Sequence, residues 1–190
     1  MPIVGWRPSG AATASEPEPE LVDYLALTLR AAFGMPSLVA KEPLDGSFAY
    51  DPVRDQHCST LLLGALAARA AGRDCKVLGV ASVDLFIPIF TYVFGEAQLE
   101  GAAAVLSVAR LRQSFWSLPE DRTLLYRRAE KEAIHEIGHT RGLVHCSSYS
   151  CAMHFSNSVE QVDAKGDRLC PGCAAEMAVA RRRAAEAFAP

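Results

Sequence analysis

The chain has 190 residues, half of them hydrophobic, and a net charge of −3 at pH 7. This length and apolar share suffice to bury one core without help from disulfides or partners, so we expect a single monomeric domain. The small negative charge excludes a broad electrostatic attraction to nucleic acid or to an anionic membrane surface. A membrane helix needs roughly 18 apolar residues, and no run in the chain reaches that length, so we expect a soluble protein that binds no membrane.

The first half of the chain predicts two helices and a loose start. We expect residues 1–20 to form a loose N-terminal segment, because the stretch up to residue 20 is rich in Ala, Ser, Thr, Pro and Glu. Residues 20–33 carry apolar side chains at helical spacing and predict the first helix. A short strand at residues 37–40 and a loop at residues 41–55 follow, and residues 55–71 predict the second helix.

The second half predicts a sheet and the longest helix. Residues 77–80, 92–94 and 103–109 are enriched in strand-forming side chains and bounded by Gly, Pro or Ser. Residues 121–141 predict a long helix, and residues 172–188 predict the last one. Helices and strands that alternate in this way indicate an α/β (α+β) sandwich with a twisted mixed β-sheet.

Three histidines and one glutamate occur together in the run from His135 to His145. Residues four apart on an α-helix differ by about 40° around the axis and about 6 Å along it, so His135 and His139 project from one face and can bind one ion. Gly142 accepts the left-handed conformation that ends a helix, after which the chain can turn back and bring in His145. Glu136 is better placed as a general base than as a further ligand. The run predicts a catalytic zinc site.

Four cysteines follow in two close pairs, Cys146 with Cys151 and Cys170 with Cys173. This spacing favours a closed structural zinc site. A disulfide framework is one alternative, but the N-terminus lacks the basic start and apolar core of a signal peptide, which favours reduced thiols in the cytoplasm. A redox dithiol is another, although no predicted strand precedes Cys170 as a thioredoxin-like unit needs. We therefore expect two zinc ions per chain, one catalytic and one structural.

The pattern continues to Met153, which alone would be read as core filler. The archaemetzincins, a branch of the metzincin zinc peptidases, have a signature that this chain resembles over His135-Glu136-x-x-His139-x-x-Gly142-x-x-His145-Cys146-x4-Cys151-x-Met153, closed by Cys170-x-x-Cys173. Upstream segments at 77–85, 92–97 and 107–111 also resemble the family, so the resemblance covers most of the chain from about residue 37. One departure is a spacer between Met153 and Cys170 that is one residue shorter than in the family pattern, a change that a loop tolerates.

The resemblance implies a role for each of these residues. The three histidines would bind the catalytic zinc, Glu136 would be the general acid and base, Met153 would form the Met-turn beneath the metal, and the four cysteines would bind the second zinc. It also implies a metzincin-like zincin sandwich with a long active-site helix. We expect residues 21–190 to form one catalytic domain, with an upper subdomain at 21–142 and a lower, zinc-stapled subdomain at 143–190.

These observations predict a cytoplasmic zinc-dependent metallopeptidase that hydrolyses peptides or partly unfolded proteins by a zinc-activated water, with a glutamate as general base. An extended substrate would pair with an exposed sheet edge, for which residues 91–94 are the candidate and residues 103–109 the alternative. Two other functions stay open. One is a catalytically silent or latent zinc protein that binds a partner in its cleft. The other is a zinc-ribbon-like module at residues 146–173, although the acidic charge balance argues against its nucleic-acid-binding form.

Two residues near the motifs have no predicted role. Tyr149 could donate a hydrogen bond to a developing oxyanion, and His154 could contact the substrate. An exposed loop tyrosine and a hydrogen-bonded structural histidine are the simpler interpretations.

Overall fold

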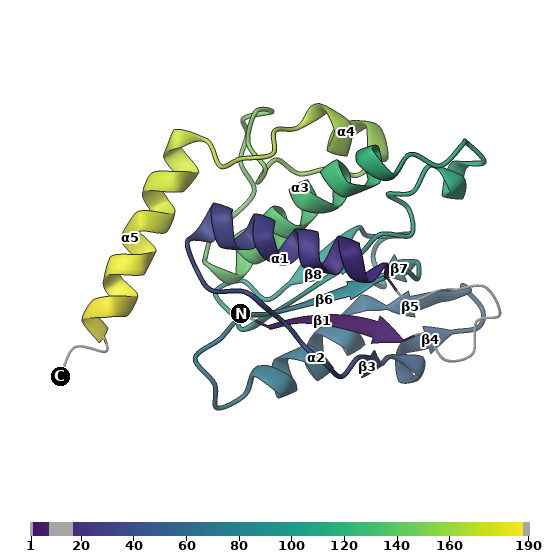
Figure 1. Ribbon diagram of the computed structural model, residues 1–190, viewed down its shortest axis with the longest axis horizontal. Helices are drawn as coiled ribbons and strands as arrows, with labels where there is room; N and C mark the ends of the chain where they lie inside the picture. The colour runs from purple at the N-terminus through teal and green to yellow at the C-terminus, as the bar shows by residue number, and fades with distance from the viewer. Residues whose placement is uncertain (1, 8–16, 188–190) are drawn as a thin grey trace.

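A computed structural model describes the backbone of residues 2–7 and 17–187 (Figure 1). The helices are α1 (Pro19–Phe33), α2 (Ser59–Ala70), α3 (Arg122–Thr140), α4 (Val159–Ala164) and α5 (Pro171–Ala187), with 3-10 turns at Ser47–Ala49 and Ser114–Trp116. The strands are β1 (Pro2–Arg7), β2 (Leu38–Val39), β3 (Leu44–Asp45), β4 (Tyr50–Asp51), β5 (Gln56–Cys58), β6 (Val77–Ala81), β7 (Leu85–Phe86), β8 (Gly95–Ala97) and β9 (Ala103–Ser107). This order confirms the predicted mixed α and β class.

The main sheet has the strand order β2-β1-β6-β9-β8, and β3 also pairs with β1. Its strands β2, β1, β6 and β9 run parallel, whereas β8 pairs with β9 in the antiparallel direction. A second, smaller sheet has the order β4-β5-β7. The sheet is therefore mixed, as expected, and β8 forms one of its edges.

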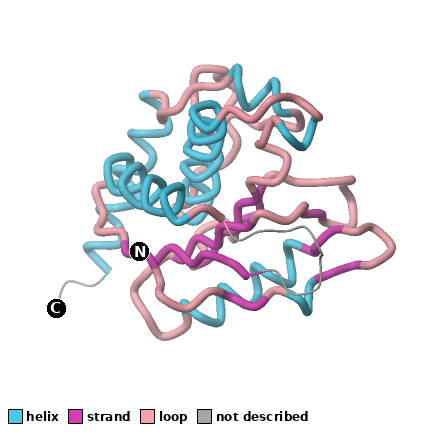
Figure 2. The backbone as a smooth tube through the Cα atoms, turned by 45° about the vertical axis from the view of Figure 1, so that its right-hand side comes forward, coloured by secondary structure: helices cyan, strands magenta, loops and turns pink. Residues whose placement is uncertain are grey.

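Helices cover both faces of the main sheet, with α1 and α3 on one side and α2 on the other (Figures 1 and 2). Every residue of β6 and β9 is buried, as in strands that are covered on both faces. Alternate side chains feed two cores: Leu78 and Leu106 pack with α1 and α3, whereas Val77 and Val105 pack with α2. This sandwich holds α3 firmly against the sheet, and α3 carries the first half of the predicted zinc motif.

Local signals set the ends of the two helices on that face. In α1, Gly34 adopts a φ of 60° and its N–H donates to the carbonyl of Arg30, which ends the helix. In α3, the side chain of Asp121 accepts a hydrogen bond from the N–H of Leu124 and caps the first turn. Both helices lie within two residues of the predicted ranges.

The N-terminal prediction was wrong for residues 2–7. We expected residues 1–20 to be loose, but β1 lies inside the main sheet, between β2 and β6. The low-complexity part of that prediction, residues 9–16, lies outside the described residues. The boundary between an upper and a lower subdomain at residue 142 stays a prediction.

Three further expectations need correction. The second helix begins at Ser59 and not at residue 55, because Asp55 has a φ of 53° and the next three residues form β5. The strand expected at residues 92–94 is instead β8, three residues later, and of the earlier segment only Val93 forms an isolated antiparallel bridge with Leu85. The loop predicted at residues 41–55 also contains the short strands β3 and β4.

The segment after α3 passes over that helix and returns to it through α4, while α5 extends away from the body of the protein (Figure 1). It contributes Leu143, Ala152, Met153 and Val162 to the larger core. This segment is therefore packed against the predicted zinc helix along its length. Within the described residues, no helix is long and apolar enough to cross a membrane.

Candidate active site

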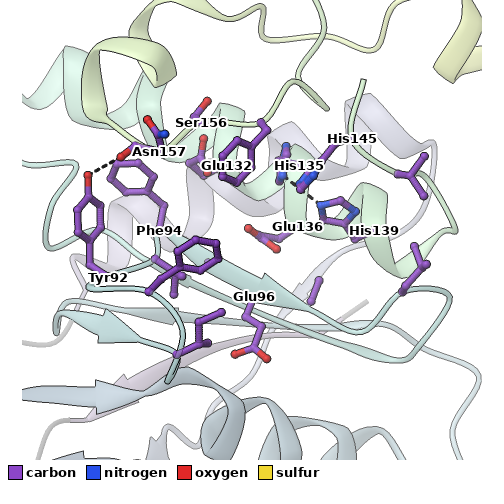
Figure 3. A pocket seen from close by; sticks show the side chains of 18 of the residues that line it. Tyr92, Phe94, Glu96, Glu132, His135, Glu136, His139, His145, Ser156 and Asn157 are labelled. Carbon is purple, nitrogen blue, oxygen red and sulfur yellow. Dashed lines mark hydrogen bonds between the residues drawn. The ribbon is translucent and has the colours of Figure 1, made fainter. Parts of the chain in front are cut away.

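The three histidines of the motif converge on one point (Figure 3). Each offers a ring nitrogen, and these three atoms lie within 4.8 Å of one another. The Nε2 atoms of His135 and His139 are 3.1 Å apart, and the ring of His145 lies 5.2 Å and 4.9 Å from the other two rings, measured between centroids. The geometry is one in which three imidazoles can hold a single metal ion.

Hydrogen bonds orient the two helical histidines. Nδ1 of His135 lies 2.9 Å from the carbonyl of Ala152, and Nδ1 of His139 lies 2.7 Å from the carbonyl of Leu143. A carbonyl can only accept, so each Nδ1 carries the proton and each Nε2 keeps a free lone pair. Burial lowers the pKa of all three histidines, which favours the neutral form that a metal requires.

The end of α3 turns the chain back towards this point. Gly142 has a φ of 88°, which L side chains rarely adopt, and its N–H donates to the carbonyl of His139. The next N–H, from Leu143, donates to the carbonyl of Gly138. These bonds close the helix and start the segment that carries His145.

Met153 lies directly against α3, between the two turns that carry the helical histidines. The side chain of Met153 is fully buried. A Cβ at Gly138 would collide with its sulfur and would lie 3.1 Å from its Cε. The absence of a side chain at Gly138 therefore lets the methionine approach the helix behind the histidine cluster.

Glu136 is buried between α3 and the edge strand β8. A Cβ at Gly95 would lie 2.5 Å from its Oε1, so the carboxyl group touches the backbone of that strand. Burial, and next the charge of Glu132, raise the pKa of Glu136 well above its ordinary value. A carboxyl group with a raised pKa beside a histidine cluster is suited to accept and return a proton.

A cavity of about 460 Å³ opens in front of these groups (Figure 3). Its walls come from residues 87–97 on one side and from residues 144–157 on the other, and the histidines and Glu136 form part of its lining. At one end the hydroxyl of Tyr92 donates to the carbonyl of Asn157 at 2.6 Å and joins the two walls. The guanidinium of Arg110 lies 3.9 Å from the centre of the Tyr92 ring and supports it from behind.

The four cysteines of the motif form a second cluster. Their sulfur atoms lie within 4.8 Å of one another, and all six cysteines of the chain are free thiols. Sγ of Cys151 accepts the backbone N–H of Cys170 at 3.3 Å. The pKa of Cys170 is lowered to about 7, first by a hydrogen bond from the N–H of Cys173, whereas burial raises the pKa of Cys173. Four thiols at this separation can hold one zinc ion in a tetrahedral arrangement, in which each bound thiol is deprotonated.

The two clusters share one short segment. His145 and Cys146 are neighbours in the chain, and the N–H of Cys146 donates to the carbonyl of Met153 at 2.9 Å. Nδ1 of His154 lies 2.9 Å from the carbonyl of Cys146 and braces the same segment. We therefore expect a change in the cysteine cluster to affect the third histidine.

The structure thus brings together all the predicted site residues, in two groups. The rings of Tyr149 and His154 contact each other at a tilt of 41°, with centres 4.2 Å apart, and neither residue lines the cavity. The sequence analysis missed Glu132, which lines the cavity and forms a buried ion pair with Lys165. Its position four residues before Glu136, on the same helix face, was the available signal.

Known proteins are similar to this chain in sequence. The family model for peptidase family M54 matches residues 70–179. The archaemetzincin of Methanocaldococcus jannaschii is 42% identical over 154 residues, which are 81% of this chain and 83% of that protein.

Two crystal structures are similar in fold. That of archaemetzincin from Archaeoglobus fulgidus, complexed with malonate, has a TM-score of 0.73 and 37% identity, with 93% of this chain and 99% of that chain covered. That of archaemetzincin from Methanopyrus kandleri has a TM-score of 0.74 and 33% identity, with 95% and 94% covered. The chain therefore belongs to peptidase family M54, the archaemetzincins, a family of zinc metallopeptidases.

Proposed function

We propose that this protein hydrolyses peptide bonds with a catalytic zinc ion held by His135, His139 and His145. The observation that carries the proposal is the convergence of three imidazoles, two of them oriented by hydrogen bonds, beside a buried carboxyl group in an open cavity. Imidazole nitrogens are preferred zinc ligands, and three of them leave a coordination position open for chemistry. The second part of the proposal is a structural zinc ion held by Cys146, Cys151, Cys170 and Cys173.

A zinc ion at the histidines would act as a Lewis acid that polarises the scissile carbonyl and acidifies a water molecule. Glu136 then takes the proton of the attacking water at its carboxylate and delivers it to the nitrogen of the leaving amine. Its contact with Gly95 fixes the carboxyl group close to the edge strand. Met153 packs against α3 at Gly138, next to His139, and the two carbonyl acceptors orient the rings of His135 and His139.

The substrate would bind in an extended form along β8. This strand has β9 on one side only, and its backbone borders the cavity. A peptide that adds to this edge would pass directly in front of Glu136. The segment at residues 91–94, which we first expected to form the edge, lines the cavity instead, and β9 is an interior strand and offers no edge.

The test is the cleavage of a diverse peptide library by the wild-type protein and by Glu136→Gln, with the zinc content of both measured. We expect the variant to keep its zinc and to lose at least about 100-fold in rate, because general-base contributions are of that order. Glu160→Gln, at an exposed position on α4, is the matched control and should cleave like the wild type.

Equal cleavage by Glu136→Gln at equal zinc content would contradict the proposed role of Glu136. If the zinc-loaded wild type cleaves no peptide, the catalytically silent or latent alternative is supported instead. The monomeric state and the cytoplasmic location stay predictions from the sequence.

A further inference from the structure

A buried ion pair lies at the inner end of the cavity. Nζ of Lys165, at the C-terminal end of α4, lies 2.7 Å from Oε1 of Glu132 on α3, and the two side chains are 0% and 4% exposed. Burying a charge costs much free energy unless an opposite charge compensates it. Each charge therefore compensates the other in this buried position.

The two members of the pair differ in their access to the cavity. Glu132 belongs to the lining, one helical turn before Glu136 and on the same face of α3 (Figure 3), whereas Lys165 is not among the lining residues. The lining of the same cavity also includes three phenylalanines, Phe90, Phe94 and Phe155. The cavity thus combines aromatic side chains with an acidic group whose charge is neutralised by Lys165.

We propose that the Glu132–Lys165 pair determines substrate specificity by keeping this part of the cavity free of net charge, so that it accepts a large uncharged side chain and rejects charged ones. The inference rests on the proposed function, since it concerns the substrate of the same site. Without Lys165, the carboxylate of Glu132 would face the cavity alone and attract a cationic side chain. Without Glu132, the ammonium group of Lys165 would attract an acidic one. Both consequences follow from the sign of the uncompensated charge in a desolvated pocket.

The test is the binding of three peptide hydroxamates to the zinc-loaded protein, measured by calorimetry. The compounds differ only in the side chain next to the hydroxamate, which is isobutyl, aminobutyl or carboxyethyl. This readout needs no turnover, because the hydroxamate chelates the zinc ion directly. We expect the wild type to bind the isobutyl compound at least about tenfold more tightly than either charged compound. The reason is that a ligand charge without a partner in a desolvated site weakens binding by at least that factor.

Three variants then separate the charges. In Lys165→Met the affinity for the aminobutyl compound, relative to the isobutyl compound, should rise about tenfold or more. In Glu132→Gln the relative affinity for the carboxyethyl compound should rise by a similar factor. The double variant, which carries no charge at either position, should show the wild-type ranking. Arg128→Met removes a comparable ion pair between α3 and α4, that of Arg128 with Asp163 at 2.6 Å, which does not line the cavity. This control should leave the ranking unchanged.

The inference is overturned if the wild type binds a charged compound as tightly as the isobutyl compound or binds none of the three. It is also overturned if the single variants keep the wild-type ranking, or if Arg128→Met changes it as much as they do. Should one single variant fail to fold, the other single variant still decides the matter, because its ranking must shift in the stated direction. A zinc-loaded wild type that shows the expected ranking and cleaves no peptide would contradict the proposed function and leave this inference standing.

Discussion

The contact between Gly138 and Met153 makes a quantitative prediction about the centre of the site. In Gly138→Ala the new methyl group would collide with the Met153 sulfur, and such overpacking costs about 2 kcal/mol. Replacement of a helical glycine by alanine returns about 1 kcal/mol, so we expect a net loss of about 1 kcal/mol. Met153→Ala removes a fully buried side chain and should cost about 3 kcal/mol.

The double variant should be more stable than the sum of these losses predicts. With Met153 shortened, the methyl group that Gly138→Ala introduces projects into the vacated space, so the collision disappears and the helical gain of about 1 kcal/mol remains. We therefore expect a total loss of about 2 kcal/mol where simple addition gives about 4 kcal/mol, a coupling energy of about 2 kcal/mol. Urea unfolding of the four proteins at one fixed zinc concentration measures this cycle. Additivity within about 0.5 kcal/mol would refute the packing of Met153 against Gly138.

Three other predictions concern the turn, the pH dependence and the link between the clusters. Gly142→Ala forces a side chain into a backbone with a φ of 88°, so it should cost about 1–2 kcal/mol of stability and weaken zinc binding at the histidines. Gly72→Ala, at a φ of 72° in open space, is the control and should lose stability but keep its zinc affinity. Equal zinc loss in both variants would contradict the role of the turn. Burial lowers the pKa of His135 and His139, so the metal-free protein should lose stability as the pH falls below about 6.5, where the unfolded chain binds these protons first. Denaturant unfolding between pH 7.5 and 5.0 measures this loss. If the free energy of unfolding of His135→Gln falls with pH as steeply as that of the wild type, this cause is wrong. Cys146→Ser should lose the cysteine-bound zinc and also weaken the histidine site next to it, whereas Cys75→Ser should change neither; zinc titrations that find an intact histidine site in Cys146→Ser would disprove the coupling.

The parts of the fold that local spacing controls could be predicted from the sequence. The helical period places His135, Glu136 and His139 correctly, because their relative positions depend only on the geometry of one helix. The glycine that ends α3 and the two cysteine pairs are local signals of the same kind. The long helix and the buried strands β6 and β9 follow from apolar patterns that tertiary structure did not override.

The errors lie where distant contacts decide. Residues 92–94 have strong strand propensity, but the register between Gly95 and Leu106 places the strand three residues later and leaves the aromatic side chains to line the cavity. The pairing of β1 with β6 joins residues more than 70 positions apart, which a short N-terminal run cannot signal. The Glu132–Lys165 pair is equally invisible in the sequence, because a lysine in a predicted loop is normally exposed.

In the proposed function, the histidine cluster holds a zinc ion on which peptide cleavage depends, and this ion is separate from the one at the cysteines. The most direct measurement is the zinc content of the wild type and of His139→Ala by native mass spectrometry, with peptide cleavage measured on the same samples. We predict two zinc ions and cleavage for the wild type, and one zinc ion with no cleavage for the variant. A variant that keeps both ions, or one that loses an ion and still cleaves, would contradict the account.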